Sequence, residues 1–268
     1  MRFSLAFRRS LPLVALAVTT ACVDTLEIPN ARYGVVSIST YQDDLVGTAM
    51  APEVIFYDKT DLRITPPSAD SCQFAAYTPS QNVNTGSFTL SAGDYLLSTI
   101  RTRTDTLRPY FIGNLAIYRP PTGRVIPFIP GDTLTLQVPG SPAGFPAITS
   151  SVRTAEAFTH EPVTTPAEGQ PLTLTWTPAP QSGSLMTFAL RYANNFSTDQ
   201  SPNEQVFCGF TDDGSGTIPA EFLDFWRNAP VASRSVRAIR LRVKEVVIDS
   251  RTRLAFVSTY GLPLLTAP

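Results

Sequence analysis

The chain has 268 residues and a formal net charge of −1, and 16% of its residues are charged, against about 25% in typical domains. A composition without a basic excess suggests no nucleic-acid partner. The 24 prolines and 15 glycines stay below the proportion of about 25–30% that is typical of disordered chains, so the chain is expected to fold.

The first 21 residues have the pattern of an export signal. Arg2, Arg8 and Arg9 precede an apolar run at 11–18 and small residues that end at Ala21. This run is shorter than the roughly 20 residues that span a bilayer, so a permanent membrane helix is not expected. Removing the segment takes away three of the 21 basic residues and none of the 22 acidic ones, which leaves 18 against 22, a formal charge of −4.

Cys22 directly follows the small residues "VTTA". The segment resembles the bacterial lipoprotein signal, although Thr19 stands where that family usually has leucine. The resemblance implies cleavage between Ala21 and Cys22, acylation of Cys22, and the membrane as a partner through this lipid. Enterobacterial lipoproteins that stay in the inner membrane usually carry aspartate directly after the cysteine. Val23 at this position therefore favours the outer membrane of the cell envelope as the destination. The alternative is an ordinary cleaved signal with a chance cysteine.

After a tether at 22–31, the chain is a series of short alternating strands separated by Pro, Gly, Asp and Asn. In "LTLTWT", for example, Leu172, Leu174 and Trp176 share one face. The pattern predicts an all-β fold of antiparallel sandwiches. The strand candidates are 34–40, 53–57, 72–77, 86–90, 95–100, 110–118, 134–138, 172–177, 185–192, 205–211, 236–243 and 254–259.

These strands are too many for one sandwich of about 100 residues, and proline and glycine concentrate near Val152. We therefore expect an N-terminal β-sandwich at 32–151 and a C-terminal one at 152–268. The stretch "GQPLTLTWTPAPQSGSLMTFALRYA" resembles the start of a fibronectin type III domain, which implies an Ig-like C-terminal sandwich. The whole layout resembles uncharacterised lipoproteins of environmental bacteria, a likeness that supplies no function.

The stretch "CGFTDDGSGTIPAEF", 208–222, looks like a calcium loop but lacks its anchoring carboxylates. With Gly216 at the turn position, Thr211 and Phe222 occupy the first and twelfth positions, where acidic ligands are needed. The stretch therefore predicts a polar turn followed by a short helix at 219–226, without a metal. A weak, irregular calcium site is the alternative.

Catalytic groups are sparse. His160 is the only histidine, and with two cysteines left after acylation it cannot complete a four-ligand zinc site. The pairs Asp43–Asp44 and Asp212–Asp213 could serve a glycosidase, but aspartate is also favoured in turns. We expect no catalytic residue and no cofactor.

Two further patterns concern charge and cysteine. Arg240, Arg242 and Lys244 alternate with apolar residues, which predicts a solvated strand face, with a patch for anionic glycans or lipid headgroups as the alternative. Cys72 and Cys208 form an even pair in an oxidising compartment, which predicts a disulfide between the two domains. Two buried thiols are the alternative.

The leading hypothesis is a lipid-anchored, non-enzymatic envelope protein that binds a protein or a glycan or acts as a spacer. The second is a carbohydrate-binding module, which would show exposed, coplanar aromatic rings. The third is a hydrolase that uses paired carboxylates.

Overall fold

The computed structural model describes residues 31–41, 49–50, 52–58, 67–77, 89–122, 124, 126–194 and 201–264. The signal segment, the lipid-attachment residue Cys22, and the pair Asp43 and Asp44 lie outside these ranges. Regular structure in the described ranges is almost entirely β-strand, so the predicted all-β class is confirmed.

The strands follow one another along the whole chain, and the short helices lie together near its C-terminal third. The strands are β1 (Arg32–Tyr41), β2 (Ala49–Met50), β3 (Glu53–Tyr57), β4 (Ser71–Ala76), β5 (Leu96–Ile100), β6 (Arg103–Ile112), β7 (Leu115–Arg119), β8 (Ile126–Pro127), β9 (Thr133–Val138), β10 (Ile148–Arg153), β11 (Leu172–Thr175), β12 (Ser184–Tyr192), β13 (Glu204–Thr211), β14 (Ser215–Ile218), β15 (Ser235–Val247) and β16 (Thr252–Leu264). The helical segments are η1 (Ala220–Phe222), α1 (Asp224–Asn228) and η2 (Val231–Ser233).

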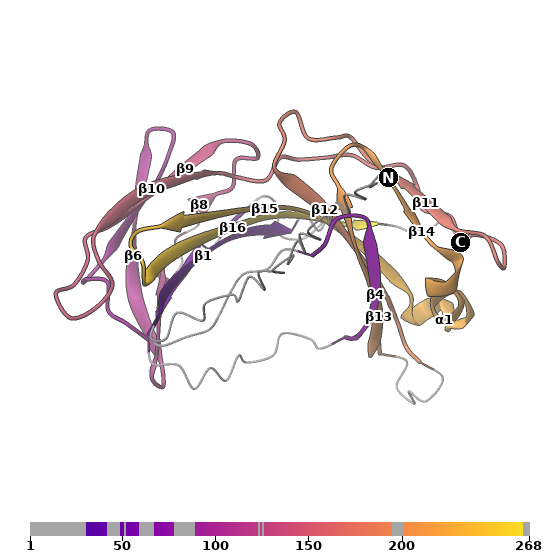
Figure 1. Cartoon of the computed structure of the whole chain (residues 1–268), viewed down its shortest axis with the longest axis horizontal. Coiled ribbons are helices and arrows are strands. Elements are labelled where there is room, and N and C mark those ends of the chain that lie inside the picture. The colour runs from indigo at the N-terminus through magenta and orange to yellow at the C-terminus, as the bar shows by residue number, and fades with distance from the viewer. Residues whose placement is uncertain are drawn as a thin grey trace, which may run out of the picture.

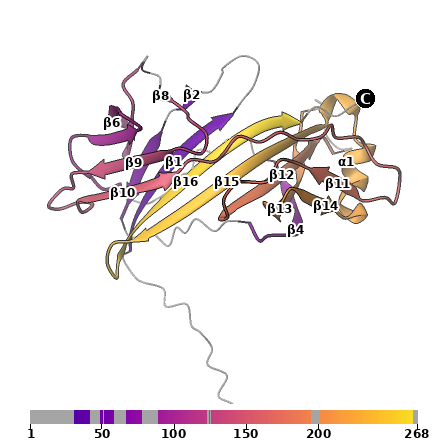
Figure 2. The same cartoon turned by 90° about the horizontal axis from the view of Figure 1, so that it is seen from above.

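Twelve of the strands form one sheet in the order β10-β9-β5-β6-β7-β3-β1-β16-β15-β12-β13-β4. The pairs β11–β14 and β2–β8 form separate two-stranded sheets. Figures 1 and 2 show the large sheet as an elongated, curved layer, with the long strands β15 and β16 running from a lobe that contains β6, β9 and β10 to a lobe that contains β4, β13 and α1.

The sheet is continuous across the boundary expected near Val152. β1, from the N-terminal half, pairs in parallel with β16, from the end of the chain, with Val35 opposite Ala255. β4, also from the N-terminal half, pairs with β13 at the far edge. The two expected sandwiches therefore share one sheet instead of following one another in tandem, because strands distant in sequence complete each other's hydrogen bonds.

The segment at 154–160, here called the crossing segment, leads from β10 towards β11 and follows the boundary expected near Val152. Thr154, Ala155 and Glu156 are buried, and the Ala155 amide donates to the Ser258 hydroxyl of β16 at 2.9 Å. The sequence around Val152 is rich in proline and glycine because the chain changes direction there, and the segment itself belongs to the core.

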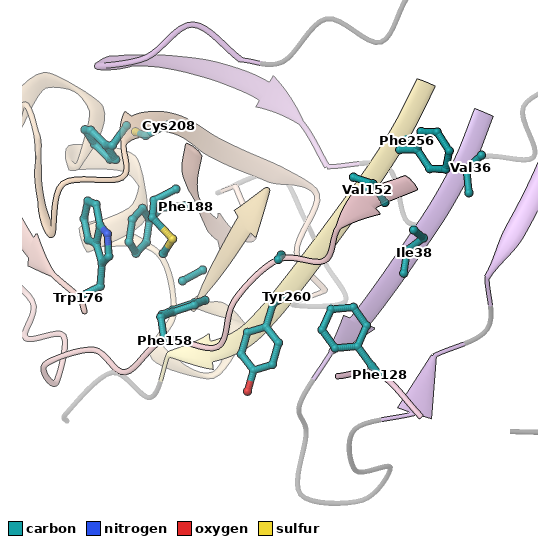
Figure 3. Close-up of a cluster of buried hydrophobic side chains, with 14 of the residues drawn as sticks. Val36, Ile38, Phe128, Val152, Phe158, Trp176, Phe188, Cys208, Phe256 and Tyr260 are labelled. Carbon is teal, nitrogen blue, oxygen red and sulfur yellow. The ribbon is translucent and has the colours of Figure 1, made fainter. Parts of the chain in front are cut away.

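The hydrophobic core extends through both lobes, and Figure 3 shows it from Val36 and Phe256 to Trp176 and Phe188. Tyr260 of β16 connects its two parts, because its ring lies 6.2 Å from that of Phe128 and 5.8 Å from that of Phe158 in the crossing segment. The aromatic contacts make the two lobes one packed unit.

One predicted strand, 110–118, is a hairpin. β6 ends at Ile112, Gly113 and Asn114 form the turn, and β7 begins at Leu115. Gly113 has a φ of +57°, which glycine adopts without the steric penalty of other residues. The prediction was wrong because the flanking residues are apolar on both sides of the turn.

Candidate functional site

A buried ion pair joins Asp212, directly after β13, to Arg240 of β15. Their side chains are 3% and 0% exposed, and the Arg240 Nε donates to Asp212 Oδ2 at 2.7 Å. Trp176 Nε1 donates to Oδ1 at 2.8 Å and Ser184 Oγ donates to Oδ2 at 2.6 Å. Protein donors thus occupy both carboxylate oxygens of Asp212. Asp212 therefore has a structural role, and its carboxylate is not open to a substrate.

A second buried pair links Arg242 of β15 to Glu156 of the crossing segment. Arg242 donates from Nε and Nη2 to the two Glu156 oxygens at 2.8 and 2.7 Å, a bidentate arrangement. The neighbouring Arg240 donates to the Ala157 carbonyl at 3.0 Å. These bonds fasten the crossing segment to β15.

The prediction of a solvated arginine face was therefore wrong for Arg240 and Arg242, which are buried, while Lys244 is exposed. The two arginines are tolerated inside because Glu156 and Asp212 neutralise them and backbone carbonyls accept their remaining protons. An anionic ligand cannot reach groups that are enclosed in this way.

The calcium look-alike follows the predicted course of strand, turn and short helix. β13 ends at Thr211, the turn leads into β14, and the η1–α1 segment follows Pro219. Asp213 serves the turn, because its Oδ1 accepts a bond from the Ser215 amide at 3.3 Å. Within the described ranges, no cluster of three or more His, Cys, Asp or Glu side chains could hold a metal ion.

His160 lies at the end of the crossing segment, opposite Trp176 in an isolated bridge. Its Nδ1 is 2.9 Å from the carbonyl of its neighbour Glu161. Neither described cysteine is available to it as a nucleophile, since both are bonded to each other.

The structure joins Cys72 of β4 to Cys208 of β13 by a disulfide. The two residues are direct cross-strand partners with Cα atoms 4.1 Å apart. The bond attaches the N-terminal-half strand β4 to the sheet edge of the other lobe, so it acts within one sheet and does not connect two separate sandwiches.

An aromatic cluster lies on the surface beside this disulfide, formed by Phe74 of β4, Phe222 of η1 and Phe225 of α1. Phe74 is 49% exposed and Phe225 is 62% exposed. The Phe74 ring is 5.0 Å from that of Phe222 with an angle of 36° between planes, and 6.1 Å from that of Phe225 with an angle of 85°. Large apolar rings gathered on the surface mark a candidate interaction site.

The outer edge of β4 lies beside the cluster. β4 is the last strand in the order of the sheet, and within the described part of the chain no strand pairs with its outer edge. Unpaired N–H and C=O groups at such an edge can accept another strand. The aromatic cluster and the edge of β4 together form what we call the distal surface, because they lie in the lobe opposite β6 (Figure 1).

Sequence reasoning did not find this site. Phe222 and Phe225 are three residues apart in "AEFLDFW", but Phe74 is more than a hundred residues earlier and comes near them only through the β4–β13 pairing. The predicted disulfide between Cys72 and Cys208 was the one signal in the sequence that could have placed "CQFAAY" beside the second lobe.

Known proteins supply no family for this chain, since no protein-family model matches it and no curated protein matches it in sequence. Among the described residues, no helix is long and apolar enough to cross a membrane.

Proposed function

We propose that the chain is a lipid-anchored, non-enzymatic protein of the cell envelope that binds a protein partner through its distal surface. The observation that carries this proposal is the pairing of exposed phenylalanines with a sheet edge that is held in place by a disulfide. The buried ion pairs and the common core stiffen the sheet, which suits a scaffold that presents this surface.

A protein partner fits the distal surface better than a glycan. A partner strand could extend the sheet at β4 by main-chain hydrogen bonds, with the adjacent aromatic rings supplying side-chain contacts. Sugar-binding platforms need rings in one plane, whereas Phe74 and Phe225 are nearly perpendicular. The carbohydrate-binding alternative is thus disfavoured by the ring geometry.

A catalytic alternative has little support among the described carboxylates. Asp212 is enclosed by Trp176, Ser184 and Arg240, and its neighbour Asp213 stabilises the turn. A glycosidase would need two carboxyl groups open to the same substrate.

We expect Cys22 to be acylated, which gives the first test of the proposal. Radiolabelled palmitate should enter the native protein and not the Cys22→Ala variant, because the thiol is the acylated group. Mass spectrometry of the mature N-terminus measures the same modification directly. Equal labelling of both proteins would contradict the anchor.

The second test concerns the distal surface. We expect a photo-crosslinking amino acid in place of Phe225 to form a discrete adduct with an envelope protein in the producing cells, whereas one in place of exposed Thr173 of β11 should not. The identified partner should bind the purified protein, and Phe225→Ser should weaken that binding at least tenfold, about 1.4 kcal/mol, because buried aromatics dominate interfaces.

A matched control is Thr173→Ala, which should leave the affinity within a factor of two. Unchanged melting of Phe225→Ser shows that only contact is lost, as expected for a side chain that is mostly exposed. Equal adducts at both positions, or selective binding to a glycan array that depends on Phe225, would refute a protein site here.

A further inference from the structure

Residues that pair directly across neighbouring strands form one row through the middle of the sheet. Counting along each strand from this row shows which strand ends lie at the same end of the sheet. The row consists of Tyr110, Ile117, Ile55, Val35, Ala255 and Glu245. Beyond it, on one side, β6 runs two residues to Ile112, β1 runs back three residues to Arg32, and β15 runs two residues to Val247. The β6–β7 turn, the start of β1 and the β15–β16 turn therefore lie at the same end of the sheet, which we call the anchor rim.

The anchor rim exposes large apolar side chains at two of its turns. Phe111 is 67% exposed and Ile112 is 56% exposed, both at the tip of the β6–β7 hairpin, and Val247 beside the β15–β16 turn is 60% exposed. A Cβ placed on Gly113 at the tip would meet nothing within 4 Å, so the space beside the turn is open among the described residues. Adjacent exposed Phe and Ile at a projecting turn mark a contact with a less polar phase.

The chain that precedes the rim limits what this phase can be. Arg32 begins β1 only ten residues after Cys22. Ten residues span at most about 33–36 Å when fully extended. An acyl chain on Cys22 would therefore keep the start of β1, at the anchor rim, within about 33–36 Å of the lipid headgroups.

The charges of the rim are balanced among the described residues. Its three positive charges are matched in number by three negative ones, namely Arg32, Arg251 and Arg253 against Asp58, Glu245 and Asp249. Arg253 is paired with Glu245 at 2.6 Å. The pKa of Asp249 is lowered, first by the hydrogen bond from the Arg251 backbone amide, so this carboxylate stays ionised. A contact made by this rim is apolar in character and does not depend on attraction to anionic lipid.

We infer that the β6–β7 hairpin tip, Phe111 and Ile112, inserts into the interface of the same membrane that holds the lipid anchor. The inference rests on the acylation of Cys22 put forward above and adds a second point of attachment to it. With two points of contact the protein has a fixed orientation, and the distal surface faces away from the bilayer. One acyl-anchored end alone would leave the sheet free to rotate on its tether.

Fluorescence quenching tests this insertion in the full mature protein. The Phe111→Trp variant is reconstituted in phosphatidylethanolamine–phosphatidylglycerol vesicles, with and without brominated acyl chains. We expect the bromine to reduce the emission of the introduced indole at least twofold, and 1 M sodium chloride to leave the quenching unchanged. The native Trp176 and Trp226 are buried and give a constant background.

The matched control is Val231→Trp, at a site that is 70% exposed in the other lobe. Its emission should not change with brominated lipid, and quenching of Phe111→Trp no stronger than this would overturn the inference. A blue-shifted but unquenched indole at the tip would also overturn it, because a second copy or another protein would then cover the hairpin.

Mass spectrometry of the same sample separates this inference from the anchor. An acylated chain whose tip is not quenched refutes the insertion and keeps the anchor. An unacylated chain whose tip is quenched refutes the anchor and keeps the insertion. An unacylated and unquenched chain refutes both.

Discussion

The Cys72→Ala, Cys208→Ala double variant should unfold with a free energy about 4–5 kcal/mol lower than the native protein. The disulfide closes a loop of 136 residues, and so long a constraint removes much of the entropy of the unfolded chain. Cys208 is fully buried, which adds a small packing loss. Urea denaturation of the two proteins, each extrapolated to zero urea with its own slope, measures the difference.

The native protein in excess reductant is the control, and it should approach the stability of the double variant. Alkylation of denatured, unreduced protein should modify neither Cys72 nor Cys208. Two modified thiols, or a stability difference below about 1 kcal/mol, would show that the bond is not part of the folded protein in solution.

Asp212→Asn should cost about 3–5 kcal/mol of stability, because it leaves the Arg240 guanidinium buried without a counter-charge. The amide is nearly isosteric, so lost packing does not contribute. It also presents donor hydrogens on one side where Trp176 Nε1 or Ser184 Oγ now donates. The loss is measured by urea denaturation.

Asp213→Asn is the matched control, since the adjacent side chain is exposed and should change stability by no more than about 0.5 kcal/mol. Equal losses for the two variants would mean that the turn, and not the buried pair, determines the effect. An Asp212→Asn variant with unchanged stability would show that the buried ion pair does not stabilise the core.

Much of the strand content could be predicted from two-residue alternation. The predicted limits of β3, 53–57, agree with the structure, and β12 and β13 differ from prediction by one residue at their starts. Alternation identifies strands because it follows from the local geometry of the pleat. It contains no information on which strands pair, so the β1–β16 pairing and the continuity of the sheet could not be foreseen.

The candidate sites show the same limit. Arg240 and Arg242 alternate with apolar residues as a solvated face would, and only the positions of Asp212 and Glu156 in space reveal that they are buried. The hairpin tip at Gly113 lay within an apolar run that concealed the turn. The distal surface combines Phe74 with Phe225, which no short window of sequence contains together.

The parallel pairing of β1 with β16 has a consequence for how the molecule is made. Synthesis proceeds from the N-terminus, so Arg32–Tyr41 emerges more than two hundred residues before its partner Thr252–Leu264. The middle of the sheet can close only when almost the entire chain is available, and such distant pairings slow folding. Until then β1 has β3 on one side and an unpaired edge on the other, and such an edge is a place where aggregation can start. Loss of the last two strands would leave β1 with only one of its two neighbours.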